Sequence, residues 1–199
     1  MTPRSSELDK MAKLFASFRT STDTRPKHKV SIDATWQPND YEANLIKKTW
    51  SEDFDDLYSL GSTIYAFIFE NNPNVKELFP AIHKHGEDWK ESKEFGSQAL
   101  KFAQTLSSVV ENIYRIDHVK QLLFKIGAKH VAFAKRGFRP EYWDVFEEAM
   151  ALAMVERIDA SKEWDENQKI DAIEAWKKLA RFIIENFKIG YSWRGHSTS

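Results

Sequence analysis

Apolar residues recur at helical spacing from Tyr41 onwards, and no alternating strand pattern or tight hairpin signal interrupts them. Pro73 suits the first turn of a short helix, and Asp165 and Gln168 have the spacing of a capping box. Ser51, followed by two acidic residues, is predicted to cap the second helix. Helical stripes mark residues 41–50, 56–72, 93–113, 116–134, 141–158 and 165–187. The pattern therefore predicts an all-α domain of about seven or eight helices.

Residues 1–40 lack this sustained periodicity and are rich in Ser, Thr, Pro and charge. We expect a flexible N-terminal extension at 1–40, the helical domain at 41–191, and a C-terminal tail at 192–199. Within the extension, one face of a short helix would carry Leu8, Met11, Phe15 and Phe18. Such a helix is expected to pack on its own domain, because one short stripe is weak evidence for the alternative, a contact with a partner or a membrane surface.

The amino-acid composition excludes several classes of function for this chain. The 199 residues are 42% hydrophobic, which is enough for one core and no second domain. With 29 Lys and Arg against 30 Asp and Glu, there is no basic excess for nucleic acid. No window reaches the ~20 consecutive apolar residues of a membrane span. The absence of cysteine excludes disulfides, thiolate nucleophiles and iron–sulfur clusters, and it fits the reducing cytoplasm, which is the expected location.

One histidine stands where helical spacing calls for a core residue. In the stretch KIGAKHVAF, steps of four, three and four back from His130 reach Ile126, Leu123 and Val119, all aliphatic. An imidazole on such a face needs partners for its ring nitrogens. It is either a core histidine bonded to a carbonyl or a metal ligand, and spacing by itself favours the core residue.

Other motifs for chemistry are weak or missing. His83 and His85 form an H-x-H pair without further ligands at metal-binding spacing, so solvated loop histidines are favoured over a zinc site. There is no Gly-rich phosphate loop, no G-x-S-x-G and no H-E-x-x-H. A hydrolase or a nucleotide enzyme therefore has no support.

From Trp50 to Phe79 the sequence resembles the globin family without a gap. Trp50 matches the tryptophan of the first globin helix, Gly61 the glycine of a helix crossing, Pro73 the proline that opens the third helix, and Phe79 the phenylalanine that wedges against the haem. KIGAKHVAF is similar to the helix that carries the proximal ligand. The resemblance covers about residues 41–191 and implies a globin fold that binds haem b, with His130 as the axial iron ligand.

The resemblance also implies the walls of a haem pocket. If His130 Nε2 binds iron, its Nδ1–H should donate to a carbonyl near Ile126. Lys101 and Arg136 stand where globins often hold the haem propionates. Apolar walls are expected from Phe79, Ile82, Phe102, Ile126, Phe138 and Phe146.

On the distal side, Gln98 occupies the position of the family's distal histidine, and Tyr65 is expected to face the ligand. This pair is familiar from tight-binding nematode and other invertebrate globins. Two donors at about 1–1.5 kcal/mol each would slow the release of dioxygen tenfold or more, because bound dioxygen carries partial negative charge. Glutamine is a poor iron ligand, so we expect five-coordinate ferrous haem. The alternative for Tyr65 is a core aromatic with a satisfied hydroxyl.

The resemblance implies a non-enzymatic protein that binds dioxygen and other diatomic gases reversibly and tightly. Slow release suits sensing, scavenging or a nitric oxide dioxygenase-type side activity better than bulk transport. Two alternatives stay open: a redox-signalling or electron-transfer globin with a readily oxidised haem, and a haem-free helical interaction module. A homodimer is not decided by the sequence.

Overall fold

The computed structural model describes residues 32–196. In this part of the chain, eight α-helices and three short 3-10 helices occur and no strand does, so the predicted all-α fold is confirmed. The helices are η1 (Ile32–Thr35), α2 (Asp40–Thr49), α3 (Phe54–Asn71), α4 (Pro73–Glu77), α5 (Pro80–His83), η2 (Gly86–Glu91), α6 (Lys93–Glu111), α7 (Ile116–His130), η3 (Val131–Arg136), α8 (Tyr142–Asp159) and α9 (Glu166–His196).

The helix ends follow their capping residues. Pro73 opens α4 as predicted. The capping box of α9 is present, because Asp165 N donates to Gln168 Oε1 at 3.1 Å and Gln168 N donates to Asp165 Oδ1 at 2.9 Å. The predicted cap at Ser51 is wrong. Asp53 caps α3, since its carboxylate accepts two backbone N–H groups of the first turn while the Ser51 hydroxyl accepts from Asp53 N.

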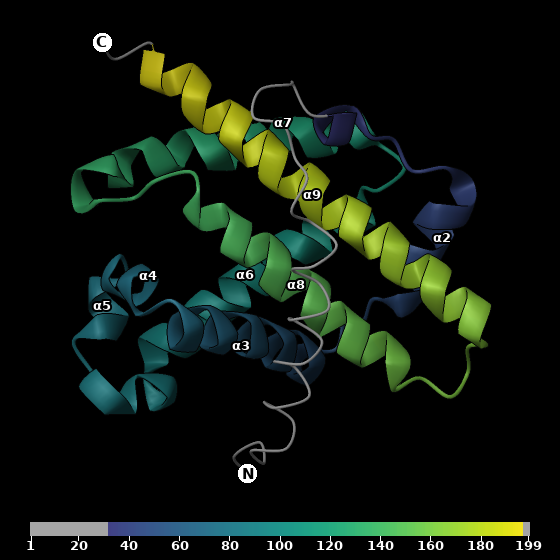
Figure 1. The fold of residues 1–199 in the computed structure, drawn as a ribbon, viewed down its shortest axis with the longest axis horizontal. Helices are drawn as coiled ribbons and strands as arrows, with labels where there is room; N and C mark the ends of the chain where they lie inside the picture. Colours follow the sequence, from purple (N-terminus) through teal and green to yellow (C-terminus); the bar gives the residue numbers. More distant parts are fainter. Residues whose placement is uncertain (1–31, 197–199) are drawn as a thin grey trace. The chain divides into compact units, whose positions relative to one another are not determined.

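Two close helix crossings position the elements around the site. At the crossing of α3 and α6, a Cβ on Gly61 would lie 2.3 Å from the Ala99 carbonyl oxygen. At the crossing of α7 and α9, a Cβ on Gly127 would lie 2.0 Å from the Phe187 carbonyl oxygen. Glycine therefore lets both helix pairs approach backbone to backbone. Figure 1 shows α9 running beside α7 and α8, with α3 and α6 on the other side of α8.

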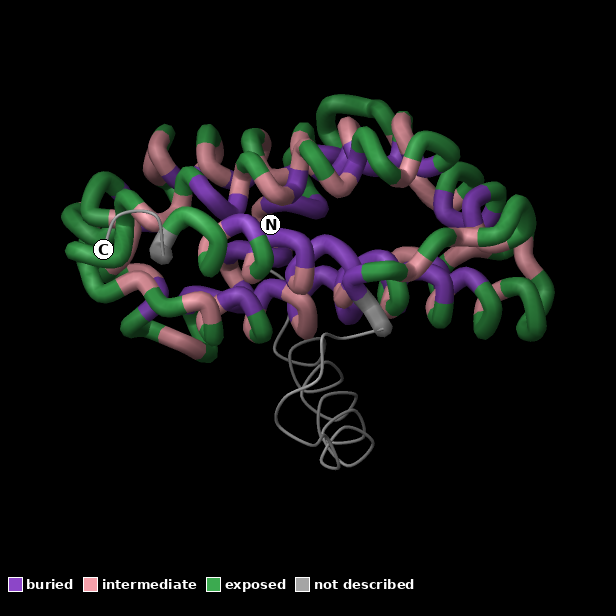
Figure 2. The backbone as a smooth tube through the Cα atoms, turned by 90° about the horizontal axis from the view of Figure 1, so that it is seen from above, coloured by how far each residue is buried: buried purple, intermediate pink, exposed green. Residues whose placement is uncertain are grey.

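Helix α8 lies between these layers and packs on both α3 and α9. Its residues from Ala149 to Val155 are all buried, so apolar side chains surround the helix instead of forming one stripe. The other long helices bury one side and expose the opposite side, which Figure 2 shows as alternating purple and green along the tube. The core thus forms where α3 and α9 turn their apolar faces towards α8, with α6 packed on α3 and α7 packed on α9.

The described structure begins before the expected domain start at Tyr41. Trp36 packs edge-on against Phe182 of α9, with ring centroids 5.8 Å apart. The buried Asn186 Nδ2 donates to the Ala34 carbonyl at 3.4 Å. Residues 34–36 are therefore held against α9 although they lack helical periodicity. The helix predicted around Leu8 to Phe18 lies outside the described residues.

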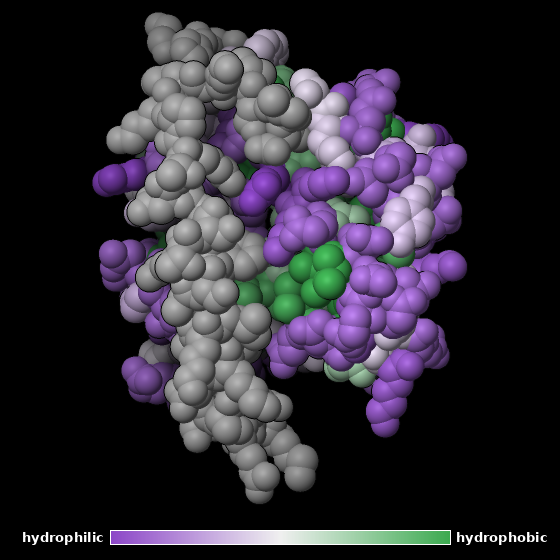
Figure 3. All heavy atoms as spheres, turned by 45° about the vertical axis from the view of Figure 1, so that its right-hand side comes forward, coloured by the Kyte–Doolittle hydropathy of each residue, from purple (hydrophilic) through white to green (hydrophobic). Residues whose placement is uncertain are grey.

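One face of the described part is largely polar. In Figure 3, hydrophilic residues cover most of the coloured area of this face, and a small hydrophobic area is visible among them. Among the described helices, none has the length and apolar character needed to cross a membrane.

Candidate functional site

A cavity of about 880 Å³ lies among the helices around His130. It brings together every residue that the sequence predicts for the site: Tyr65, Phe79, Ile82, Gln98, Lys101, Phe102, Ile126, His130, Arg136, Phe138 and Phe146. These residues come from α3, the α4–α5 region, α6, α7, η3, the turn after η3, and α8, and most of the lining is apolar. The size and the apolar lining are those of a small-molecule or cofactor site.

His130 is the last residue of α7 and faces this cavity. Its Nδ1 lies 2.8 Å from the Ile126 carbonyl oxygen, which is the hydrogen bond expected from the sequence. Burial lowers the pKa of the imidazole, and the Ile126 carbonyl opposes this only in part, so the ring is neutral at pH 7. Since Nδ1 donates to the carbonyl, Nε2 carries the lone pair of the ring. Nε2 forms no hydrogen bond with a described residue.

Aromatic rings hold His130 in place. Trp143 packs edge-on against the imidazole, with ring centroids 5.1 Å apart, and Phe138 lies at 5.4 Å. Phe187 of α9 stacks nearly parallel to the imidazole at 6.4 Å. The ring therefore has a fixed orientation, because rotation would displace packed aromatic neighbours.

Tyr65 and Gln98 meet on another wall of the cavity. Gln98 Nε2 donates to Tyr65 Oη at 2.8 Å, and this leaves the hydroxyl hydrogen of Tyr65 for a second acceptor. Tyr65 is only 4% exposed, and burial raises the pKa of its hydroxyl despite the opposing hydrogen bond from Gln98. The hydroxyl is thus protonated over the whole physiological range and is available as a donor.

The Tyr65 ring is fixed by surrounding aromatic side chains. Phe146 lies 5.2 Å away, and Phe79 and Phe102 each lie 5.7 Å away, all in edge-on contact. Phe102 therefore packs beside Tyr65 and leaves the contact with Gln98 intact. The structure brings the two polar side chains together within an otherwise aromatic wall.

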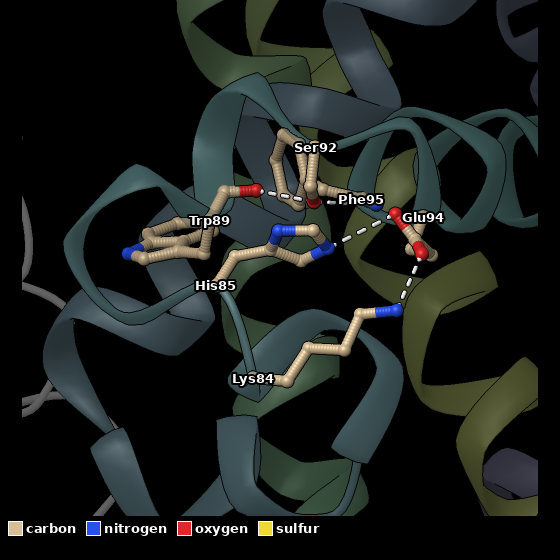
Figure 4. A network of polar contacts seen from close by, with 6 residues as sticks. All are labelled: Lys84, His85, Trp89, Ser92, Glu94 and Phe95. Atoms are coloured by element: carbon tan, nitrogen blue, oxygen red, sulfur yellow. Dashed lines mark hydrogen bonds and ion pairs between the residues drawn. The ribbon is translucent and has the colours of Figure 1, made fainter.

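Charged side chains stand at the edge of the cavity. Lys101 and Arg136 line it from α6 and η3 and are both exposed. Glu94, also a lining residue, binds Lys84 Nζ at 2.9 Å through one carboxylate oxygen and His85 Nε2 at 3.1 Å through the other (Figure 4). The Lys84 contact is the main cause that lowers the pKa of Glu94 to about 2. This network ties the segment after α5 to the first turn of α6.

The segment between α5 and α6 is anchored by Trp89. Its ring is 6% exposed and packs edge-on against Phe69 at 5.5 Å and Phe95 at 5.0 Å. Ser92 then caps α6, because its hydroxyl accepts from Phe95 N at 3.2 Å and donates to the Trp89 carbonyl at 2.6 Å (Figure 4). Anchoring this segment fixes the start of α6 and therefore the position of Gln98 on that helix.

Among the described residues, no three His, Cys, Asp or Glu side chains cluster as possible metal ligands. His83 is the last residue of α5, and His85 lies just after it and contacts Glu94. Of the histidines between residues 34 and 194, His130 is the one that lines the cavity.

Sequence reasoning missed several lining residues, of which Trp143 and Phe187 matter most because they pack on His130. Phe187 was available as the end of the apolar stripe of the last helix. Trp143 gave no comparable signal, since it belongs to α8, where buried residues occur on all sides. The remaining unpredicted lining residues are Val75, Leu78, Pro80, Ala81, Lys93, Glu94, Ser97, Thr105, Phe133 and Tyr142.

Comparisons with known proteins agree with this arrangement. The chain is 29% identical over 132 residues to globin-related protein glb-13 of Caenorhabditis elegans, a match that covers 66% of the chain and 44% of that protein. It is 27% identical over 93 residues to cytoglobin-2 of Danio rerio, covering 46% of the chain and 52% of that protein. The chain thus spans about half the length of these two relatives.

A solved structure shares the fold. It is the crystal structure of a hexacoordinated haem protein from an anhydrobiotic tardigrade at pH 4, with a TM-score of 0.64 and 20% sequence identity, and the match covers 78% of this chain and 96% of that one. The globin family model matches residues 62–186, which is more than half of the chain. The chain therefore belongs to the globin family.

Proposed function

We propose that the chain binds haem through His130 and uses this haem to bind dioxygen reversibly and tightly. The observation that carries the proposal is one cavity that holds a neutral imidazole on one wall and a paired tyrosine and glutamine on another. The residues that line the cavity are suited to haem. The apolar lining suits the macrocycle, the Nε2 lone pair suits iron, and Lys101 and Arg136 suit its two carboxylates. Haem b is the form that we infer, because the chain has no cysteine for covalent attachment.

When bound, ferrous haem supplies an iron atom that binds dioxygen and places partial negative charge on it. The contribution of the protein to dioxygen binding is then electrostatic. Tyr65 lines the cavity and keeps its hydroxyl hydrogen for a bound ligand, since Gln98 donates to a lone pair of the oxygen. A preoriented donor in a site shielded from water stabilises negative charge without reorganisation. The neighbouring rings of Phe79, Phe102 and Phe146 exclude water from this side.

The described residues also support a five-coordinate ferrous state. Gln98 donates to the Tyr65 hydroxyl, and His85, which does not line the cavity, is bound to Glu94. Neither is placed as a strong sixth ligand for iron. The tardigrade protein that shares the fold is hexacoordinated, so the coordination state must be measured for this chain itself. Tight oxygen binding suits sensing or scavenging in the cytoplasm better than bulk transport.

Absorption spectroscopy tests this proposal. We expect the purified chain to show a Soret band, a five-coordinate ferrous spectrum, and an oxygenated spectrum that persists and reverses when oxygen is removed. A chain that takes up no haem would instead be a helical interaction module. A low-spin six-coordinate ferrous spectrum or rapid oxidation by oxygen would contradict the proposed site and favour a redox-signalling role.

A further inference from the structure

A second cavity, of about 600 Å³, shares no lining residue with the cavity around His130. One of its walls is a face of α2, which contributes residues at positions i, i+3, i+4 and i+7. The other wall is the connection between α8 and α9 together with the first turn of α9, a helix that lies beside α2 (Figure 1). This cavity has the size of a small-molecule site. Its lining residues are Tyr41, Asn44, Leu45, Lys48, Glu163, Trp164 and Gln168.

Two amide side chains line this second cavity with their oxygen atoms already occupied. Asn44 Oδ1 accepts a hydrogen bond from the Tyr114 hydroxyl at 2.9 Å. Gln168 Oε1 accepts a hydrogen bond from Asp165 N at 3.1 Å. Neither NH2 group has a hydrogen bond to a described residue, so each amide keeps its two N–H donors. A ligand that meets these side chains must therefore offer acceptors, as a carboxylate does.

The two charged residues of the lining are opposite in sign and unpaired. Lys48 of α2 and Glu163 of the connection are both exposed, and neither forms an ion pair with another described residue. By contrast, Lys178 of α9 pairs with Glu42 of α2 at 2.6 Å. The second cavity thus offers separate partners for a negative group and a positive group of a ligand.

The remaining lining is aliphatic or aromatic. Leu45 is 5% exposed, and the Tyr41 ring is held by the hydrogen bond that its hydroxyl donates to Asp171 Oδ2 at 2.8 Å. Trp164 is half-buried, and it is the one tryptophan of residues 36–193 whose ring lies in no aromatic pair, whereas the other six each contact an aromatic ring. Its indole is therefore available to pack on an apolar group of a ligand.

We propose that this second cavity binds a free α-amino acid with an apolar side chain. Lys48 would bind the carboxylate of the ligand, and the amides of Asn44 and Gln168 would donate to the same group. Glu163 would bind the ammonium group, and the ligand side chain would pack on Trp164. The site is independent of the proposed function, because no residue of the haem cavity takes part in it.

A simple anion is the competing ligand, and the charges around the second cavity favour it less. The hydrogen bond to Asp171 and the charges of Asp171 and Asp165 raise the pKa of the Tyr41 hydroxyl, so negative charge surrounds this wall. An anion would also leave Glu163 beside its carboxylate, and a simple cation would leave Lys48 beside its ammonium group. A zwitterion has no net charge and pairs both of its charged groups.

NMR spectroscopy of the purified, isotope-labelled chain tests this site with three related probes. L-Phenylalanine is the proposed type of ligand, hydrocinnamate lacks its ammonium group, and phenethylamine lacks its carboxylate. We expect L-phenylalanine to shift the indole N–H signal of Trp164 and the NH2 signals of Asn44 and Gln168 saturably, with a Kd below about 1 mM. Each of the other two probes should bind about tenfold more weakly or less, because it leaves one charged lining residue unpaired. The ferrous carbon monoxide form is diamagnetic and is used if the chain carries haem.

Variants that remove one charge decide which residue binds which group of the ligand. Glu163→Gln should remove the preference for L-phenylalanine over hydrocinnamate and keep the preference over phenethylamine. Lys48→Gln should do the reverse. Because each variant keeps one preference, unfolding cannot produce this pattern. The matched controls Lys162→Gln and Glu87→Gln, at exposed positions outside the lining, should keep the Kd of the wild type within about twofold.

Three results would overturn the amino-acid site. One is the absence of saturable shifts with L-phenylalanine up to about 10 mM. Another is equal binding of hydrocinnamate by the wild type, which would indicate an anion site, and the third is equal binding of phenethylamine, which would indicate a cation site. The Soret band of the purified chain tests the haem proposal separately, so either proposal can fail without the other.

Discussion

Replacing Tyr65 by Phe should accelerate the release of dioxygen. The substitution removes one oxygen atom from a ring that three phenylalanines hold in edge-on contact at 5.2–5.7 Å, so the ring itself has no reason to move. What is lost is the hydroxyl hydrogen that Gln98 leaves available by donating to Tyr65 Oη at 2.8 Å. A hydrogen bond to a charged acceptor contributes about 1.5–3 kcal/mol. At about 1.4 kcal/mol per tenfold, the dissociation rate should rise about 10- to 150-fold.

The assay is stopped-flow replacement of dioxygen by carbon monoxide. Carbon monoxide carries little negative charge when bound, so its own dissociation rate should change by less than about threefold and serves as the internal control. Gln98→Leu should also accelerate release, because it removes a second donor and the bond that orients Tyr65. The double variant should show less than the sum of the two effects, since the side chains act through one shared contact.

An unchanged dioxygen rate in Tyr65→Phe would refute the reasoning. An equal change in the dioxygen and carbon monoxide rates would refute it as well, because this would indicate that the ring had moved.

Two further predictions concern the scaffold. Gly127→Ala should destabilise the protein by about 1–3 kcal/mol in urea unfolding, since its Cβ would meet the Phe187 carbonyl, whereas Gly96→Ala should be nearly neutral because it meets only a movable side-chain end. Glu94→Gln should lower the stability of the protein above pH 4.5. The difference in stability from the wild type should vanish as the pH falls from 4.5 to about 2. The reason is that the folded-state pKa of Glu94 lies below its ordinary value, and the carboxylate contributes to stability only while it is ionised. A stability difference that grows as the pH falls would contradict the predicted Glu94 contacts.

Helical periodicity predicted most of the fold because four of the long helices bury one face each. It also predicted the capping box of α9, since Asp165 and Gln168 make a local contact that needs no tertiary information. The cap of α3 was harder. Ser51 and Asp53 are both good capping residues two positions apart, and only the path of the chain decides which one accepts the backbone N–H groups.

The site was predictable in a different way. Spacing by itself placed His130 on an apolar face without distinguishing a ligand from a core residue, and the ordered match from Trp50 to Phe79 was needed to interpret it. The role of Trp143 was not predictable, because it depends on how α8 packs between two layers. The contact between Tyr65 and Gln98 likewise depends on the crossing of α3 and α6 at Gly61. Tertiary packing, not local pattern, makes these contacts.

The most direct test of the account is the absorption spectrum of ferrous His130→Gly with and without imidazole. The substitution removes the ring whose Nδ1 bonds Ile126 and leaves a space bounded by aromatic side chains that free imidazole can enter. We predict that the variant loses the five-coordinate ferrous spectrum of the wild type and that imidazole restores it. A variant whose spectrum equals that of the wild type without imidazole would show that His130 does not bind the iron.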